Sequence, residues 1–435
     1  MLRNIRGLHI EGRKQMSTEA PIQTYLKPEY VYVPLSCGPV PYKAIVAVGD
    51  KVLKGQAVAL REDRFGHPIH SSVSGVVSAI KKMWHPFARM VETIEIKNDF
   101  QEIAIADFGQ PLKELTKENI INRVKNAGIV GLGGAGFPTY IKYMSNRDAK
   151  VVIINAAECE PYLTADAMLI QTAVDKLIRG IKYIMIASGA PKAVIAIKKT
   201  KRTLIAHLES SLVNNPQISV FLLNDVYPAG WEKYIVERVL KKSYHSLPIE
   251  VGAVINNVAT VIAVCEAIEE NKPLIEKVIT ITGEGIKQPQ NFFVKIGVKA
   301  SDLISLAGGY VDDLEDAYFI AGGPMSGKAI FLDDMIITPY LTSVIVKPKG
   351  FVGLAQPCMG CGKCAEYCPA YLTPTEIKKA FLAGDLEEAE KQGALKCVQC
   401  GLCSYVCPSR VEITDSVVKA QEAVKKANSA KVKKG

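Results

Sequence analysis

Eight of the eleven cysteines in this chain lie in two short runs near its C-terminal end. Each run has the pattern Cys-x2-Cys-x2-Cys-x3-Cys-Pro, which begins at Cys358 in the first run and at Cys397 in the second. With this spacing, three thiolates from one tight turn reach three irons of a 4Fe-4S cubane, and Gly360, Gly362 and Gly401 ease the turns. Paired Cys-x2-Cys also builds zinc ribbons, but two complete runs, each closed by Cys-Pro, favour two 4Fe-4S clusters.

The fourth cysteine of each run decides how the two clusters are connected. In proteins with two such runs, this cysteine ligates the cluster of the other run. The sequence therefore predicts cluster I on Cys358, Cys361, Cys364 and Cys407, and cluster II on Cys397, Cys400, Cys403 and Cys368. Crossed ligands would hold the two clusters close together, as an electron relay requires.

The segment between the runs carries two helix-start patterns. Thr373, Pro374 and Glu376 have the form of a capping box with proline at the first helical position, and Asp385 with Glu388 repeats the pattern. We therefore expect two short helices between the cluster turns, which is a helical variant of the ferredoxin arrangement.

The length and composition limit what must surround these cysteines. A chain of 435 residues is too long for one ordinary hydrophobic core, so several domains are expected. The longest apolar run, residues 251–265, contains Asn256 and Asn257 and is shorter than the roughly 20 residues that cross a bilayer. We predict no membrane span, and the polar start of the chain indicates a cytoplasmic protein without a secretory signal.

The formal charge of +9 invites a nucleic-acid interpretation, but this value counts every cysteine as neutral. Thiolates bound to two clusters would lower the charge, and we predict no nucleic-acid partner. Much of the remaining charge lies in the Lys-rich segment at the C-terminal end. This segment is either a disordered solvated end or a contact for anionic lipid or a partner protein.

Upstream of the cysteines, residues 128–142 read GIVGLGGAGFPTYIK. Such dense glycines bring backbone N–H groups close to a large anion, although a structural turn explains the bare pattern equally well. Polar motifs then follow two apolar strands: Asn155-Ala-Ala-Glu158-Cys159-Glu160 and Asn256-Asn257-Val-Ala-Thr260. Two acids on either side of a cysteine at a strand end favour a catalytic role for Glu158 and Glu160.

These three segments together resemble the flavin- and NADH-binding subunit of respiratory complex I. Residues 30–410 as a whole resemble the C-subunit family of Rnf electron-transport complexes. The resemblance implies FMN held without a covalent bond and NADH stacked on its ring. It places these residues around the flavin phosphate and ribityl chain: Gly131, Gly133, Gly134, Ala135 and Lys142.

The same resemblance assigns further residues to the two cofactors. Phe137 would lie near the nicotinamide or adenine, and Glu160 would face the dinucleotide. The polar atoms of the flavin ring and ribityl chain would be held by Asn155, Glu158, Asn256, Asn257 and Thr260. Tyr227 and Glu232 belong to the family's Tyr-x-x-Gly-x-Glu stretch. The chain departs from the complex I pattern at Leu132, Ala157 and Trp231.

Two modules flank this central part. Residues 44–80 have short strand-like runs and Gly turns that suggest a barrel-sandwich of the biotinyl-lipoyl type. The carrier lysine of such domains is replaced here by Arg64, so we interpret the module as structural or as a docking surface. His67 and His70 beside it are expected to be ordinary loop histidines. Residues 278–309 resemble a β-grasp domain without catalytic residues of its own.

The predicted fold class is multidomain α/β and α+β. The expected domains are a barrel-sandwich hybrid with its N-terminal lead (1–110), a Rossmann-like FMN- and NADH-binding domain (111–272), a β-grasp domain (273–346), a helical dicluster ferredoxin domain (347–420) and a Lys-rich tail (421–435). The β-grasp domain is expected to pack between the flavin domain and the clusters.

The resemblance implies an NADH-oxidising subunit, in which FMN converts hydride transfer into single electrons for the clusters. Its partners would be other Rnf-type membrane subunits and ferredoxin-like subunits, with Na⁺ or H⁺ movement coupled to electron transfer. The chain would be peripheral, on the cytoplasmic side of the cell membrane. Two alternatives remain open: a flavin and iron-sulfur cobalamin reductase, and a non-enzymatic electron relay or assembly subunit.

Overall fold

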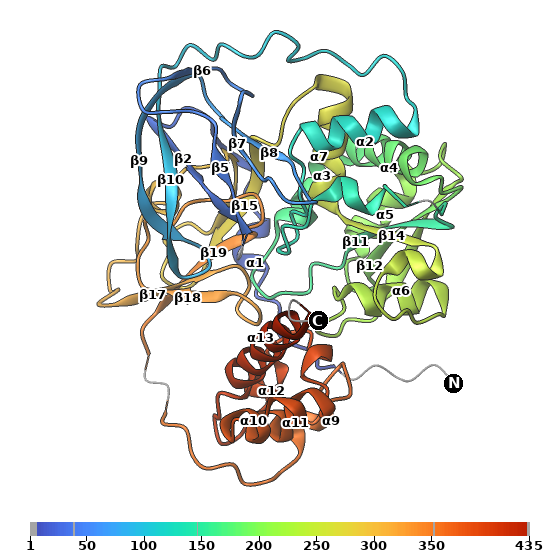
Figure 1. Ribbon diagram of the computed structural model, residues 1–435, viewed down its shortest axis with the longest axis vertical. Coiled ribbons are helices and arrows are strands. Elements are labelled where there is room, and N and C mark those ends of the chain that lie inside the picture. Colours follow the sequence, from blue (N-terminus) through green and yellow to red (C-terminus); the bar gives the residue numbers. More distant parts are fainter. Residues whose placement is uncertain (1–6, 38–39, 146, 351–352, 433–435) are drawn as a thin grey trace.

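The computed structural model describes residues 7–37, 40–145, 147–350 and 353–432. Figure 1 shows an upper body with β-sheets on one side and an α/β domain on the other, and a smaller helical lobe below them. The predicted multidomain combination of α/β and α+β parts is confirmed.

The N-terminal sheets form the predicted barrel-sandwich. Alternating apolar residues of the long hairpin, including Val77, Ile94 and Ile96, are fully buried between small sheets. The four-stranded sheet has the order β2 (Tyr30–Pro34), β10 (Arg89–Asn98), β9 (Gly75–His85) and β6 (Lys51–Val52). The smaller sheets contain β3 (Ser36–Cys37) with β4 (Val40–Pro41), and β5 (Lys43–Ala44), β7 (Ala57–Leu60) and β8 (Pro68–His70).

The central domain is a four-stranded parallel sheet covered by helices. Three of its strands are nearly continuous apolar runs, as expected where both faces of a parallel sheet are covered, whereas one edge strand is partly exposed. The order is β13 (Ile218–Leu223), β12 (Ala193–Lys198), β11 (Val151–Ala156) and β14 (Ala253–Asn257). Around it lie α2 (Lys117–Asn126), η1 (Thr139–Lys142), α3 (Ala165–Thr172), α4 (Val174–Ser188), α5 (Arg202–Ser211), α6 (Glu232–Leu240), η2 (Pro248–Val251) and α7 (Val258–Glu270).

The register of this sheet sets the position of the predicted site. Asn155 on β11 pairs with Asn257 on β14, and the two strands are parallel. Their carboxyl ends therefore meet at one edge, where ligands of open α/β sheets bind. The polar motifs that follow the two strands are brought together here.

The β-grasp domain supplies a mixed sheet and a helix, α8 (Ala300–Leu306). The sheet order is β1 (Gln23–Tyr25), β16 (Gln290–Lys295), β15 (Glu276–Thr282), β19 (Ser343–Pro348), β17 (Ala317–Ala321) and β18 (Lys328–Ile330). Its first strand comes from the N-terminal lead, and α1 (Gln15–Thr18) packs on β15 and β16. The lead therefore belongs structurally to the β-grasp sheet. The predicted boundary at residue 110 stays a prediction.

The C-terminal lobe is helical, as predicted. It contains α9 (Lys363–Glu366), α10 (Pro374–Leu382), α11 (Leu386–Lys391), η3 (Ala394–Lys396), α12 (Leu402–Tyr405) and α13 (Ile413–Val432). The two helices expected between the cysteine runs are α10 and α11. Asp385 accepts a hydrogen bond from the Glu388 amide at 2.8 Å, whereas the Thr373 side chain makes no capping hydrogen bond. The predicted capping box is therefore wrong at Thr373.

The Lys-rich end is not the disordered segment that its composition suggested. Helix α13 continues to Val432 because Val417, Ala420 and Val424 lie on its buried side and pack on the small core of this lobe. Residues 433–435 lie outside the described residues. The predicted tail boundary at residue 420 falls inside this helix.

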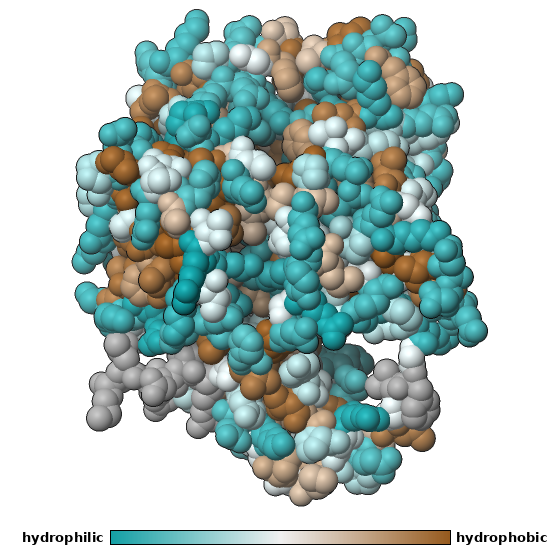
Figure 2. Space-filling model, turned by 180° about the vertical axis from the view of Figure 1, so that it is seen from behind, coloured by the Kyte–Doolittle hydropathy of each residue, from teal (hydrophilic) through white to brown (hydrophobic). Residues whose placement is uncertain are grey.

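The surface carries no single large apolar face in the view of Figure 2. Apolar side chains there form scattered patches among hydrophilic ones on both the upper body and the lower lobe. Within the described part of the chain, no helix is long and apolar enough to cross a membrane.

Candidate functional site

The four cysteines predicted for cluster II surround one cavity. Cys368, Cys397, Cys400 and Cys403 all line a cavity of about 20 Å³, whose remaining walls are largely apolar, with Leu372, Leu402 and Val417 among them. One of these cysteines comes from the first run and three come from the second. The structure thus brings together the crossed ligand set, and the donor chemistry fits a 4Fe-4S cluster.

The surroundings of these sulfur atoms determine whether the thiols are protonated before a metal binds. The pKa of Cys400 is raised to about 12 and that of Cys403 to about 11, chiefly by burial and in part by the neighbouring thiolates, while hydrogen bonds to the two sulfur atoms act in the opposite direction. Without a cluster these thiols therefore hold their protons. Cluster assembly must displace them, which ties iron binding to proton release.

Hydrogen bonds to sulfur are already in place around this cavity. The amides of Gln399 and Leu372 each lie 3.4 Å from a sulfur atom, that of Cys397 and that of Cys368 respectively. The Thr414 hydroxyl lies 3.2 Å from the Cys403 sulfur. Such donors stabilise negative charge on cluster ligands and raise the reduction potential of the cluster.

The cysteines predicted for cluster I are less enclosed. Cys358 and Cys361 are exposed, while Cys364 is buried. Cys407 packs in the same small core as Cys364, and the Val411 amide lies 3.4 Å from the Cys407 sulfur. The described residues contain no group of three or more His, Cys, Asp or Glu side chains arranged to hold a single metal ion. The cluster I ligand set stays a prediction.

The glycine loop is held by hydrogen bonds at Gly131 and Leu132, and its tip is exposed. The Gly131 amide donates to Phe137 O at 2.8 Å, and the Leu132 amide donates to the Thr260 hydroxyl at 2.9 Å. Gly134 has a φ of +110°, and a Cβ atom built there would meet nothing within 4 Å. Gly133, Gly134 and Ala135 are exposed, so this part of the backbone is free to approach a ligand.

Beneath the loop lies a cavity of about 30 Å³ lined by Leu132, Glu158, Asp166, Asn257 and Lys277, among others. In the residue before Asn257, the buried Asn256 amide nitrogen has no hydrogen-bond partner, and the Asn256 oxygen accepts from Tyr143 at 3.2 Å. An unpaired buried donor beside an open glycine loop fits a polar aromatic ligand with a phosphate. These residues therefore fit FMN.

Lys142 reaches toward the same edge of the sheet from the short helix η1. Its ammonium donates to Ile255 O at 2.8 Å and lies 3.7 Å from the Glu232 carboxylate. Burial lowers its pKa, and the Glu232 charge acts in the opposite direction. On the opposite flank, the Asn155 amide donates to Gly230 O at 2.9 Å and so supports the loop between Tyr227 and Glu232. The structure thus gathers the residues of the predicted flavin site, with Phe137 half-exposed at its rim.

Glu158 is held by residues that sequence reasoning missed. Its carboxylate lies 3.2 Å from the Lys14 ammonium and accepts a hydrogen bond from the Asp166 amide at 2.9 Å. Asp166 in turn accepts from the Asn257 amide at 2.5 Å. Lys14, Asp166 and Lys277 carry no recognisable motif. The one feature that could have pointed to Asp166 is its position in the first turn of the helix that follows the Glu158 motif.

Asp166 should make stability depend on pH. Burial and the charge of Glu158 raise its pKa to about 7, while the hydrogen bond from Asn257 acts in the opposite direction. The folded state therefore keeps the Asp166 proton between about pH 4 and 7, where the unfolded chain releases it. This contribution to stability is complete below about pH 4 and is lost as pH rises toward 7.

Between about pH 4.5 and 7.5, we expect the free energy of unfolding of the flavin-free wild type to fall by roughly 1–3 kcal/mol more than that of Asp166→Asn. Denaturant unfolding at both pH values measures this difference. Asp148→Asn is the matched control, because the Asp148 side chain is 75% exposed. Parallel pH profiles for wild type and Asp166→Asn would contradict the assignment.

Glu160 does not point into open space. Its carboxylate accepts hydrogen bonds from the Met325 amide at 3.0 Å and from the Ser326 hydroxyl. The Tyr227 oxygen lies 3.2 Å from the same carboxylate and 2.8 Å from Cys400 O. Burial raises the pKa of Glu160. The flavin domain, the β-grasp domain and the cluster lobe therefore meet at this glutamate, and its contact with a dinucleotide stays a prediction.

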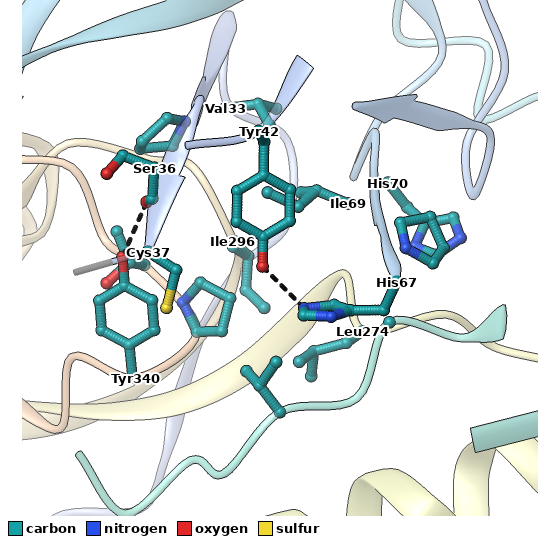
Figure 3. A pocket seen from close by; sticks show the side chains of 16 residues that line it. Val33, Ser36, Cys37, Tyr42, His67, Ile69, His70, Leu274, Ile296 and Tyr340 are labelled. Carbon is teal, nitrogen blue, oxygen red and sulfur yellow. Dashed lines mark hydrogen bonds between the residues drawn. The ribbon is translucent and has the colours of Figure 1, made fainter. Parts of the chain in front are cut away.

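His67 and His70, which were expected to be ordinary loop histidines, are both buried. Figure 3 shows them beside a cavity of about 40 Å³ where the barrel-sandwich meets the two following domains. His67 is 4% exposed and its ring lies 2.7 Å from the Tyr42 oxygen, while burial lowers the pKa of His70 to about 4. Tyr340, from the β-grasp domain, donates to Ser36 O at 3.3 Å. His67 lies in the hairpin loop and His70 at the end of β8, and packing of the neighbouring domains buries both side chains.

Four domain families match the chain in the predicted order. They are the RnfC barrel sandwich hybrid domain (residues 2–101), the Nuo51 FMN-binding domain (124–266), the SLBB domain (278–329) and a 4Fe-4S dicluster domain (354–411). Among solved structures, an NAD⁺-reducing [NiFe]-hydrogenase in the H2-reduced state is similar, with a TM-score of 0.50. It is 20% identical, and the match covers 72% of this chain and 63% of that chain, which supports a shared fold.

Curated relatives are similar over most of the chain. The C subunit of the Na⁺-translocating ferredoxin:NAD⁺ oxidoreductase complex of Acetobacterium woodii is 34% identical, over 89% of this chain and 89% of that protein. Its proton-translocating counterpart in Clostridium ljungdahlii is 34% identical, over 87% and 84%. The C subunit of the ion-translocating oxidoreductase complex of Vibrio cholerae is 31% identical, over 88% of this chain and 51% of its own length.

Proposed function

The chain belongs to the C-subunit family of Rnf-type ion-translocating oxidoreductase complexes, and we propose that it passes electrons between NADH and ferredoxin-linked subunits of such a complex. The observation that supports this proposal is the direct contact between the FMN-type domain and the cavity predicted to hold cluster II. Tyr227 belongs to the flavin domain and contacts a residue of cluster II directly. A site for two-electron chemistry and a site for one-electron chemistry would thus be adjacent.

FMN supplies the conversion between a hydride and single electrons when it is bound. The exposed backbone of Gly133, Gly134 and Ala135 would approach the flavin phosphate and ribityl chain, and Lys142 would add a positive charge. Asn256 would donate its unpaired amide hydrogen to the flavin ring. The carboxylate of Glu158, fixed by Lys14 and the Asp166 amide, would orient polar atoms at the ring edge.

NADH would lie over the open side of the glycine loop, with Phe137 beside it. Phe137 is 37% exposed and its ring packs 5.8 Å from that of Phe65. Leu132 and Trp231 stand where the complex I pattern has other residues, yet both help to build the fold here. Leu132 is buried under the loop, and Trp231 packs on the core around β11.

The partners in this proposal are the membrane-embedded and ferredoxin-like subunits of an Rnf-type complex. Coupling to Na⁺ or H⁺ movement would take place in those membrane-embedded subunits. This chain would attach to the cytoplasmic side of the membrane as a peripheral subunit. The match of residues 2–101 to the RnfC barrel sandwich domain favours this role over a cobalamin reductase.

An anaerobic reduction experiment tests the proposal. The purified chain, loaded with FMN and iron-sulfur clusters, should lose its flavin absorbance when excess NADH is added. NADH titrated by calorimetry into the same sample should bind. A flavin-loaded chain that neither binds NADH nor bleaches with it would be a relay or assembly subunit, and the dehydrogenase proposal would be wrong.

A further inference from the structure

Three domains converge on a few atoms next to cluster II. We call this place the junction and define it by Glu160, Tyr227, Met325, Ser326 and Cys400. The first two residues belong to the flavin domain, the next two to a loop of the β-grasp domain, and the last to the cluster lobe. These residues are joined by direct hydrogen bonds, with donor and acceptor atoms 3.2 Å or less apart.

The Tyr227 hydroxyl has two possible acceptors at the junction. The Cys400 carbonyl and the Glu160 carboxylate both accept, and the single hydroxyl proton of Tyr227 is directed to the nearer acceptor, Cys400 O, at 2.8 Å. The Glu160 carboxylate, at 3.2 Å from the Tyr227 oxygen, is the secondary acceptor and is itself fixed by two donors of the β-grasp loop. The Tyr227 hydroxyl is thus positioned from both sides, and its proton bridges the flavin domain to the backbone of a cluster ligand.

The packing at the junction leaves no room for adjustment. A Cβ atom on Gly401 would lie 2.2 Å from Met325 O, and a Cβ atom on Gly323 would lie 2.2 Å from the Glu160 carboxylate. Both glycines therefore permit close approach of the cluster lobe and the β-grasp loop. The side of the lobe that carries Cys400 therefore faces the flavin domain.

The two clusters differ sharply in their surroundings. The four cysteines around the cluster II cavity are half-buried, and Cys400 is part of the junction. By contrast, residues 354–363 are all exposed, and this segment includes Cys358 and Cys361 of predicted cluster I. Met359, between those two cysteines, is 69% exposed. One end of the lobe is thus covered by the flavin domain, and the other end is open to an acceptor.

We propose that cluster II receives electrons first from the flavin domain, through a contact that Tyr227 and Glu160 position, and that cluster I is the exit to a one-electron partner protein. This inference rests on the proposed function, because it needs a flavin donor and two clusters. Tyr227 acts as a positioning residue for the transfer. Each two-electron donor oxidised yields two single-electron transfers along the same route, and the proton that the donor releases goes to water.

The order of the clusters is tested by removing them one at a time. In Cys361→Ala, which lacks cluster I, NADH should still reduce the remaining cluster at the wild-type rate, as measured by rapid-freeze EPR. In Cys403→Ala, which lacks cluster II, the remaining cluster should be reduced by dithionite but at least tenfold more slowly by NADH. The reverse pattern, or equal rates in the two variants, would overturn the inference.

Tyr227→Phe tests the junction with both clusters present. The substitution removes one hydroxyl and keeps the ring. Stopped-flow absorbance measures the cluster reduction rate and the flavin reduction rate. The ratio of the first rate to the second should fall ~5–10-fold, which corresponds to the loss of one hydrogen bond. Hydrogen exchange should rise in residues 397–407. Tyr310→Phe is the matched control, because the Tyr310 hydroxyl also donates one hydrogen bond, to Asp333 at 2.6 Å, but lies in the β-grasp domain away from the junction. An unchanged rate ratio with unchanged exchange would refute the positioning role.

These outcomes separate the inference from the proposed function. If NADH fails to bleach the flavin in the wild type, the proposed function fails. Flavin reduced by light with an organic donor then replaces NADH in the same variants, and the order of the clusters is still measured. If NADH bleaches the flavin and the cluster order is reversed, only the inference fails.

Discussion

Replacing Cys368 by alanine should remove cluster II and spare cluster I, although Cys368 belongs to the first cysteine run. Cys368 lines the same cavity as Cys397, Cys400 and Cys403, so its loss leaves a three-thiolate site. The iron content should fall from about eight to about four atoms per chain. Iron and sulfide analysis of the anaerobically purified protein measures this change.

Combined substitutions decide which cluster is lost. Cys368→Ala added to Cys403→Ala should cost no further iron, because both residues serve cluster II. Cys368→Ala combined with Cys361→Ala should remove nearly all iron, because the two residues serve different clusters. Cys37→Ala is the control, because Cys37 is a half-buried free cysteine outside both runs. The opposite pairing, with further iron lost only in the Cys403 combination, would contradict crossed ligation.

A second large effect is expected at the tip of the glycine loop. Gly134→Ala places a methyl group in the open space where the flavin phosphate and ribityl chain would lie, and forces a side chain into a φ of +110°. The purified protein should lose most of its FMN, with at least a tenfold weaker affinity measured by fluorescence titration. The backbone strain alone should cost about 1 kcal/mol of stability.

The matched control for this substitution is Gly49→Ala. Gly49 has a φ of +95° and also has nothing within 4 Å of a built Cβ atom, but it lies in the barrel-sandwich, far from the glycine loop in sequence and in fold. The two variants should be destabilised to a similar degree, and only Gly134→Ala should lose FMN. Retention of FMN by Gly134→Ala would place the flavin elsewhere.

The parts of this protein that were predictable from the sequence depend on local patterns. The cysteine spacing encodes cluster turns within a few residues, and apolar runs such as those before Asn155 and Asn256 encode buried parallel strands. The polar motifs after these strands were grouped through the resemblance to a known flavin subunit, and the parallel pairing of the two strands then places them at one edge.

The parts that were missed depend on contacts between distant segments. Lys14 reaches Glu158 across 144 residues, and Tyr227 reaches Cys400 across 173. A lone lysine in a polar lead carries no signal for such a partner. His67 and His70 look like loop residues until the neighbouring domains cover them. The lysines of α13 suggested disorder because the apolar residues that bury the helix are spaced among charges.

The central claim is that this chain converts two-electron oxidation into one-electron transfer. Its most direct test is an anaerobic titration of the fully loaded chain with NADH, with the flavin absorbance and the cluster EPR signals recorded on the same sample. We predict that NADH reduces both flavin and clusters, and that each NADH delivers two electrons to them. Bleaching of the flavin while both clusters stay oxidised, although dithionite reduces them, would contradict the claim.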